Sequence, residues 1–491
     1  MNNTSQPRPF PTQRLFQPQL SNRSPVNRHV NRHGFLKLLN NSAILRGSRL
    51  AIATLAASSV ALVGSPTPEA VALEDSPKVI VDEVWQIVNN EFVGRDFDQE
   101  AWQATRQELL SREYSSQEQA YRAIRDALGD LGDPYTRFLN PKQFADLTSQ
   151  TTGELSGIGI RLMVDESSSA LTVVEALDES PAKQAGIEKG DRILKINGQH
   201  TSLMTVEQAA ELLRGEEGTD VTLQLTRPER GLYEVTLTRA QVEVPVLHAS
   251  IKEENGVRIG YLKLDEFSSH AAEQMEKAIA RLQAEDVKGF VLDLRGNPGG
   301  LLFASVDIAR MWMSQGTIVR TVDRMGGNQE YAANNSALTD LPLVVLVDGN
   351  SASASEILAG ALKDNDRATI VGTRTYGKGT VQSVHSLSDE SGLAVTISRY
   401  YPPSGINING QGIAPDVELN LTNEQQRLLR SNPNAFGTGR DPQYRQALNV
   451  LQSRVLGEKV PTEPEPISIH QLLETELEAD NVNEQVNQPL R

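Results

Sequence analysis

The chain contains no cysteine, and this absence removes two kinds of site. Without thiols there are no disulfides and no thiolate metal ligands, while the redox state of the compartment stays open. The seven histidines are scattered, with no H-E-x-x-H pair and none in a recognisable catalytic motif. The sequence therefore predicts neither a metal centre nor a histidine base. Its 491 residues, 38% of them hydrophobic, suffice for roughly two to four domains with real cores.

Acidic residues are also missing from the first 68 positions, where eight basic side chains occur. An apolar run at 50–63 follows, and Ala70-Val71-Ala72 has the A-x-A form of a cleavage site. We interpret residues 1–72 as a targeting leader, and the lack of a twin-arginine pair favours general secretion. An uncleaved leader would instead act as an anchor and hold the protein loosely at a membrane.

The charge balance excludes one class of partner. Removing residues 1–72 takes away the eight basic residues and one acidic residue, which leaves 39 basic against 62 acidic residues and a formal charge of −23. Nucleic-acid binding depends on clustered lysine and arginine, because the phosphate backbone is negatively charged. We therefore expect no nucleic-acid partner.

The hydrophobic periodicity divides the rest of the chain into four parts. Residues 73–150 have helical spacing and predict an N-terminal helical region. Residues 151–242 have strand periodicity around one helix at 206–213 and predict a small, mostly β domain. At 243–425, apolar strands alternate with helical patterns, which indicates an α/β core with a buried sheet.

The expected strands and helices of this core can be placed by number. Strands are predicted at 289–294, 343–347 and 368–371, and helices at 301–313 and 354–362. Residues 426–491 are expected to form one amphipathic helix followed by a disordered tail rich in Glu, Asn, Gln and Pro.

Two segments of the β domain closely resemble a PDZ domain. One is Ser156-Gly157-Ile158-Gly159-Ile160 at a strand start, and the other runs from Ser180-Pro181-Ala182 to Gly190-Asp191-Arg192-Ile193-Leu194-Lys195-Ile196-Asn197-Gly198. In PDZ domains the glycine-bearing loop presents N–H groups to a peptide's C-terminal carboxylate, and the peptide adds a strand to the sheet. Glycine permits the close approach between backbone and carboxylate that such a cluster of N–H groups requires. The resemblance implies that Gly157, Ile158, Gly159 and Ile160 bind the substrate.

The block Ser351-Ala352-Ser353-Ala354-Ser355-Glu356 opens an apolar helical pattern. Ser353 to Glu356 fits the S-x-x-E capping box, so a helix cap is one interpretation. A serine nucleophile at a helix N-terminus is the other, because the helix dipole favours developing negative charge there. Spacing alone leaves Ser351 and Ser355 as rival nucleophiles.

Tyr376-Gly377-Lys378-Gly379 offers a lysine that could act as the base for such a serine. Residues 372–378 also satisfy the start of the phosphate-binding GxxxxGK pattern, but Gly379 replaces the required Ser or Thr and a strand pattern follows. A solvated turn is the remaining alternative. Lys378 becomes an effective base only if burial lowers its pKa from about 10.4.

The segment Asp293-Leu294-Arg295-Gly296-Asn297-Pro298-Gly299-Gly300 turns from a strand into a helix. Its exposed N–H groups could supply one oxyanion donor, with the backbone of Ala354 as the second. A tight structural turn without catalytic function would have the same pattern.

Taken together, these ordered motifs resemble the C-terminal processing peptidases, or tail-specific proteases, over roughly residues 77–455. The resemblance implies a crotonase/Clp-protease-like α/β core with an inserted PDZ domain. It implies Ser353 as nucleophile, Lys378 as general base and Gln382 as the residue that orients the lysine, with Gly299 and Ala354 at the oxyanion hole. Arg214 resembles a PDZ arginine that helps to assemble the active site.

The implied activity is serine endopeptidase cleavage at or near the C-terminus of exported proteins, without a cofactor, in the periplasm or thylakoid lumen. Substrates are polypeptides with free C-termini, and one candidate is the photosystem II reaction-centre precursor if the source is photosynthetic. A PDZ scaffold that no longer cleaves and a hydrolase or lyase of small thioesters are the alternatives from other classes. The sequence leaves open whether one precursor or many proteins are cut, and the oligomeric state.

Overall fold

The computed structural model describes residues 76–94, 97–165, 168–254 and 256–456, all of which belong to one compact unit, Pro68–Arg491. The predicted leader and the predicted disordered tail lie outside the described residues. Within the described part of the chain, no helix is long and apolar enough to cross a membrane.

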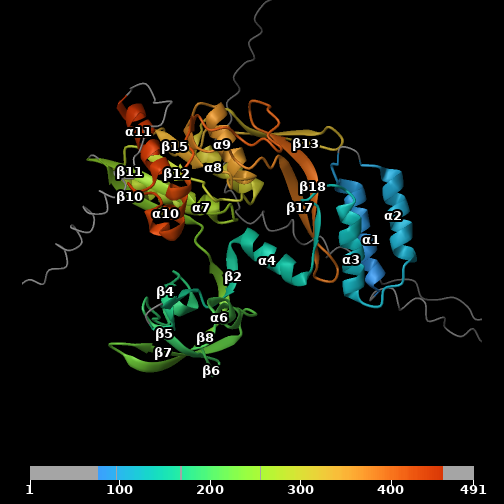
Figure 1. Ribbon diagram of the computed structural model, residues 1–491, viewed down its shortest axis with the longest axis horizontal. Coiled ribbons are helices and arrows are strands. Elements are labelled where there is room, and N and C mark those ends of the chain that lie inside the picture. The colour runs from blue at the N-terminus through green and yellow to red at the C-terminus, as the bar shows by residue number, and fades with distance from the viewer. Residues whose placement is uncertain (1–75, 95–96, 166–167, 255, 457–491) are drawn as a thin grey trace, which may run out of the picture. The chain divides into compact units, whose positions relative to one another are not determined.

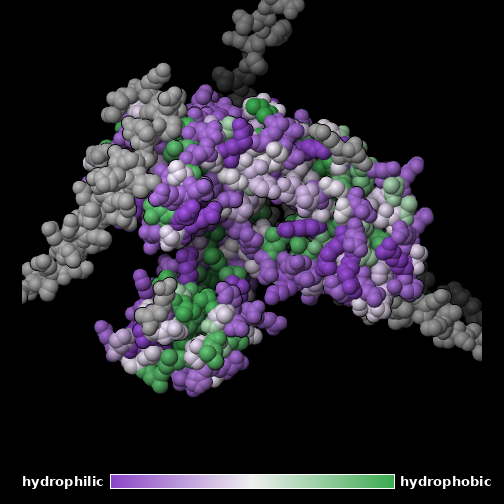
Figure 2. All heavy atoms as spheres, viewed as in Figure 1, coloured by the Kyte–Doolittle hydropathy of each residue, from purple (hydrophilic) through white to green (hydrophobic). Residues whose placement is uncertain are grey.

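The N-terminal region consists mainly of helices (Figure 1). Its elements are α1 (Pro77–Glu91), α2 (Gln99–Ser111), α3 (Gln117–Gly129), β1 (Arg137–Leu139) and α4 (Pro141–Thr152). Ser76, Asp98 and Asn140 cap α1, α2 and α4 with their side chains, which satisfies backbone N–H groups at the helix starts. The apolar faces of α1 to α3 pack against strand β18 (Gly392–Tyr401), whereas the outer faces are mostly hydrophilic (Figure 2).

The PDZ-like domain follows α4. It contains β2 (Glu154–Gly157), β3 (Ile160–Asp165), β4 (Ala170–Ala176), α5 (Pro181–Gln184), β5 (Arg192–Ile196), β6 (Gln199–His200), α6 (Val206–Leu213), β7 (Asp220–Arg227), β8 (Gly231–Thr238) and β9 (Ala240–Glu243). The order of the main sheet is β3-β4-β5-β7-β8, and β2 pairs with β9 in a separate antiparallel ribbon. The ribbon joins the segments that enter and leave the domain, so the domain is inserted between α4 and the core.

The core has a six-stranded sheet in the order β10-β11-β12-β15-β16-β19. Its strands are β10 (Leu247–Glu254), β11 (Val257–Leu264), β12 (Phe290–Asp293), β15 (Leu343–Val347), β16 (Thr369–Gly372) and β19 (Val417–Glu418), parallel from β11 onward. Helices α7 (Ala271–Ala284), α8 (Leu302–Trp312) and α9 (Ala354–Asp364) cover one face, and α11 (Pro442–Leu456) covers the other.

Alternate residues of the central strands face these two layers. Val345 packs with α8 and α9, while its neighbours Val344 and Leu346 pack against α11. Both faces are therefore buried, which explains why strand β15 is apolar at every position, as expected for a parallel sheet. The predicted α/β core with a buried sheet is confirmed.

A second sheet connects the core to the N-terminal helices. It has the order β1-β18-β13-β14, with β17 also paired to β18. Its further strands are β13 (Thr317–Asp323), β14 (Asn328–Ala332), β17 (Thr380–Ser386) and β18 (Gly392–Tyr401), and the remaining short elements are α10 (Asn423–Ser431) and η2 (Pro433–Ala435). Strand β1 joins this sheet through Phe138, which pairs with Leu393. The segment at 133–139 is thus held beside β17 and β18.

Candidate active site

Ser353 occupies the turn between strand β15 and helix α9. It is the N-cap of α9, with φ 55° and ψ −112°. A serine in this conformation carries backbone strain of about 1–3 kcal/mol, which the surrounding structure must offset. The predicted capping box forms at this helix start, with Ser353 N donating to the Glu356 carboxylate at 2.9 Å. The cap and the nucleophile are therefore compatible roles for this segment.

The rival serines are both engaged elsewhere. Ser351 Oγ is fully buried and donates to the carbonyl of Leu294 at 2.9 Å. Ser355 Oγ is also fully buried and donates to the carbonyl of Asn297 at 3.0 Å. Ser353 is only half-buried. Its accessibility supports Ser353 as the nucleophile.

The glycine turn lies directly against Ser353. Gly299 has φ 107°, and a Cβ on it would lie 2.8 Å from Ser353 Cβ and 3.0 Å from Ala354 N. Only glycine permits this approach. The structure therefore brings both predicted oxyanion residues, Gly299 and Ala354, to Ser353. The Ala354 N–H has no hydrogen-bond partner among the described residues, whereas the Gly299 N–H donates to Asn297 Oδ1 at 2.8 Å.

Lys378 lies just before strand β17 and is half-buried. Its Nζ is 4.9 Å from the ring centroid of Tyr135. Burial lowers the pKa of Lys378 because desolvation disfavours the ammonium form, and the charge of Arg137 lowers it further. Asp133 and Glu356 oppose this shift. The environment therefore favours the neutral amine that a general base requires.

Glu356 joins the segments of Ser353 and Lys378, a contact that the sequence did not reveal. Its fully buried carboxylate accepts from Ser353 N at 2.9 Å and from Lys378 N at 2.9 Å. It also accepts from Gly377 N at 2.7 Å and Thr375 Oγ1 at 2.6 Å. Burial raises the pKa of Glu356, and these donors oppose the rise because they stabilise the ionised form. The S-x-x-E spacing was the only signal of this residue.

Tyr400 makes a second link between the same two segments. Its buried hydroxyl contacts the carbonyl oxygens of Ser353, at 3.1 Å, and of Lys378. Nothing in the local sequence around Tyr400 indicates this contact, because it joins β18 to two loops that lie more than twenty residues away.

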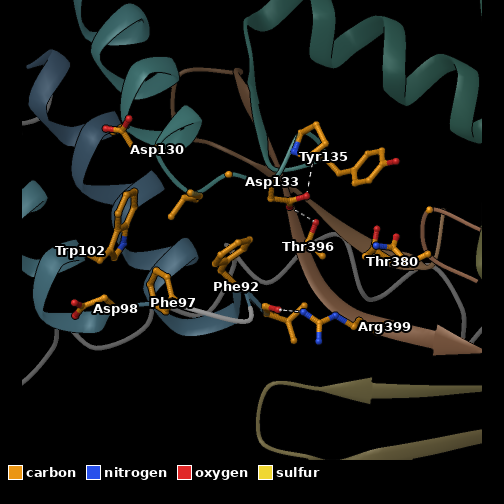
Figure 3. A pocket seen from close by; sticks show the side chains of 18 of the residues that line it. Phe92, Phe97, Asp98, Trp102, Asp130, Asp133, Tyr135, Thr380, Thr396 and Arg399 are labelled. Atoms are coloured by element: carbon orange, nitrogen blue, oxygen red, sulfur yellow. Dashed lines mark hydrogen bonds between the residues drawn. The ribbon is translucent and has the colours of Figure 1, made fainter. Parts of the chain in front are cut away.

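Gln382 lies in strand β17, four residues after Lys378 in the sequence. Its Nε2 donates to Thr380 Oγ1 at 2.9 Å and to Thr396 Oγ1 at 3.3 Å, and among the described residues it has no hydrogen bond to the lysine. Thr396 Oγ1 in turn donates to Asp133 Oδ2 at 2.6 Å, as Figure 3 shows. Thr380, Thr396 and Asp133 border a cavity of about 700 Å³ that also reaches Tyr135. Gln382 stays a predicted orienting residue.

The predicted PDZ loop lines a separate groove of about 170 Å³. Gly159 has φ 71°, and a Cβ on it would lie 2.3 Å from Ser180 Cβ, so glycine is required there. In the described part of the chain, the N–H groups of Ile158 and Gly159 have no hydrogen-bond partner. Arg214, which follows α6, lines the same groove and is exposed. The loop can therefore receive a carboxylate.

A buried ion-pair network supports the start of the glycine turn. Arg295 Nη2 lies 2.6 Å from Asp293 and 2.7 Å from Asp441, and both carboxylates are completely buried. Burial by itself would raise the pKa of Asp293, but the charge of Arg295 holds it below the usual range. Tyr261 OH also donates to Asp293 at 2.7 Å.

Arg295→Ala should destabilise the fold by about 3–5 kcal/mol, because it leaves two buried carboxylates without their counter-charge. Arg295→Lys should also be destabilising, since an ammonium cannot reproduce the forked contacts. Chemical unfolding of the purified variants measures both values. A loss below about 1 kcal/mol for Arg295→Ala would contradict this account of the network.

Comparison with known proteins identifies the family. The model of peptidase family S41 matches residues 258–419, and a PDZ domain model matches residues 172–227. A carboxyl-terminal-processing protease of Synechocystis sp. is 38% identical over 391 residues, which cover 79% of this chain and 90% of that protein. The protein of the same name in Picosynechococcus sp. is 40% identical over 394 residues, covering 79% and 92%.

A solved structure, a photosystem II D1 C-terminal processing protease, has 34% sequence identity and a TM-score of 0.47, and the match covers 75% of this chain and 99% of that one. The identities over nearly the whole length of the curated relatives show the family. This chain, with its PDZ domain and its α/β core, belongs to the carboxyl-terminal-processing proteases of peptidase family S41, which are serine endopeptidases.

Proposed function

We propose that Ser353 and Lys378 form the catalytic dyad with which this protease cleaves polypeptides at or near their C-terminus. The observation that carries the proposal is the Glu356 carboxylate, which binds the backbone N–H of both residues at 2.9 Å. This shared acceptor fixes the backbone of Ser353 relative to the backbone of Lys378. Such an arrangement supplies the proximity that nucleophilic catalysis requires.

In the proposed reaction, Ser353 Oγ attacks the peptide carbonyl carbon while its proton passes to the neutral amine of Lys378. The carbonyl oxygen becomes an oxyanion, which the N–H groups of Ala354 and Gly299 stabilise. Lys378 then protonates the leaving amine, and water hydrolyses the acyl-enzyme by the same steps. Gln382 acts on the lysine through Thr396 and Asp133.

The PDZ groove is proposed to bind the free C-terminus of the substrate. The N–H groups of Ile158 and Gly159, which have no partner among the described residues, are suited to its carboxylate, and Arg214 adds a positive charge to the same groove. The physiological substrates are proposed to be exported proteins in the periplasm or thylakoid lumen, the compartment to which the leader would deliver this protease. The photosystem II reaction-centre precursor is the narrower candidate.

Amidation of the substrate's C-terminus should lower kcat/KM at least about tenfold, because it removes the charge that the PDZ loop binds. The measurement compares a protein with a free, apolar C-terminal tail and the same protein carrying a C-terminal amide. Equal cleavage of both would contradict C-terminal recognition. Binding without any cleavage would instead indicate a scaffold.

The dyad also predicts a pH dependence. Because Lys378 must be neutral, kcat/KM should rise with pH through the depressed pKa of Lys378 and level off below pH 10.5, the usual lysine value. Arg137 lowers this pKa and is exposed, so Arg137→Gln should move the rising limb to higher pH. Asp133→Asn should move it to lower pH. Profiles of kcat/KM against pH at low ionic strength test the direction of each shift. Shifts in the reverse directions would contradict Lys378 as the general base.

A further inference from the structure

One of the two oxyanion donors is already occupied in the structure. Gly299 N donates to Asn297 Oδ1 at 2.8 Å, and Asn297 is completely buried. The amide of Asn297 is itself held, because its Nδ2 donates to the carbonyl of Leu264 at 2.9 Å. A single N–H forms one short, well-aligned hydrogen bond at a time. Gly299 therefore cannot donate to a substrate oxyanion while it is bound to Asn297.

The peptide unit that carries this N–H makes no other hydrogen bond to the described residues. Among the described residues, the carbonyl of Pro298 accepts no hydrogen bond, and Pro298 is exposed. A rotation of this unit changes only ψ of Pro298 and φ of Gly299, and glycine tolerates a wide range of φ. The bond to Asn297 is thus the one hydrogen bond of this peptide unit, within the described chain, that a rotation must break.

The atoms on either side of this peptide unit are fixed. The carbonyl of Asn297 accepts from Ala352 N at 3.1 Å and from Ser355 Oγ at 3.0 Å. The carbonyl of Gly299 accepts from Phe267 N at 2.9 Å. A rotation can therefore be confined to a single peptide, while the nucleophile's turn stays in place beside it.

We propose that Asn297 is a positioning residue whose side-chain oxygen competes with the oxyanion for the Gly299 N–H. The proposal rests on the proposed function of Ser353 and Lys378. When Ser353 Oγ bonds to the carbonyl carbon, its proton moves to Lys378 and the carbonyl π pair moves to oxygen. The charge on that oxygen draws the Gly299 N–H away from Asn297, and the oxyanion hole becomes complete only at this step.

The test uses two probes built from the acyl side of a peptide that the enzyme cleaves. A C-terminal aldehyde forms a tetrahedral adduct with Ser353, whereas the corresponding alcohol binds without an oxyanion. Asn297→Ala removes the competing oxygen and should tighten aldehyde binding about tenfold, with alcohol binding changed less than about twofold. Asn297→Asp keeps an acceptor at this position and should not tighten it. Thermal unfolding of both variants reports whether they fold.

A crystal structure of the wild-type aldehyde adduct tests the same point without a variant. The proposal expects Gly299 N about 3 Å from the adduct oxygen and no longer bonded to Asn297. An adduct in which Gly299 N still donates to Asn297 would overturn the proposal and leave the dyad intact, as would weaker aldehyde binding by a folded Asn297→Ala. If the wild type neither cleaves peptides nor forms the adduct, the dyad itself fails.

Discussion

Ser353→Ala and Lys378→Ala are each expected to reduce kcat/KM at least about a thousandfold, because each removes a group that acts in the transition state. The double variant should be scarcely slower than either single one, since the two residues act as a unit. The measurement is cleavage of a protein with a free, apolar C-terminal tail by the purified enzyme and its variants.

Lys378→Arg tests whether Lys378 acts as a base or only contributes a positive charge. Arginine keeps the charge but does not lose its proton in proteins, so this variant should be as inactive as Lys378→Ala. A matched control is Lys363→Ala, which removes a lysine paired with Asp416 at the far end of α9 and should stay within about twofold of wild type. Appreciable activity of Lys378→Arg would contradict the dyad. Activity of Ser353→Ala would indicate Ser351 or Ser355 as the nucleophile instead.

Glu356→Ala is expected to cause the second largest loss, at least about a hundredfold in kcat/KM. It leaves the buried donors Gly377 N–H and Thr375 Oγ1–H and the partly buried N–H groups of Ser353 and Lys378 without an acceptor, and it separates the two halves of the dyad. Unsatisfied buried donors cost about 1–3 kcal/mol each, so the fold should lose at least about 3 kcal/mol. Steady-state kinetics and chemical unfolding measure the two effects.

Two further variants define the role of Glu356. Glu356→Gln retains the shape but turns an amide N–H₂ toward donors, so its activity should lie between those of wild type and Glu356→Ala. Glu276→Ala on the exposed face of α7 should change stability by less than about 0.5 kcal/mol. If Glu356→Ala lost stability but kept kcat, Glu356 would be a structural residue only.

Local sequence patterns were enough to predict the elements whose residues face one consistent environment. The predicted helix at 206–213 is α6, and the predicted strand at 343–347 is β15. Strand β15 is apolar throughout because both faces are buried, and α6 is periodic because only one face is. Such elements can be read from a short window of the chain.

Other elements depend on partners that are remote in sequence. Strand β1 follows the turn at 133–136 and exists because Phe138 and its neighbours pair with β18, more than 250 residues later. Strand β18 was not predicted, although it is the centre of the second sheet. Pairing of this kind has no local signature, since a strand's environment is set by its neighbours.

The sequence by itself determined the family motifs, the order of the domains and the candidate residues Ser353, Lys378 and Gly299, because each lies in a short segment with its own chemistry. Only the tertiary structure decided how they act together. There Glu356 accepts from the backbone N–H groups of both Ser353 and Lys378, and Asn297 accepts from the Gly299 N–H. The physical reason is that burial, pKa and hydrogen-bond partners arise from contacts between distant segments, which no local pattern contains.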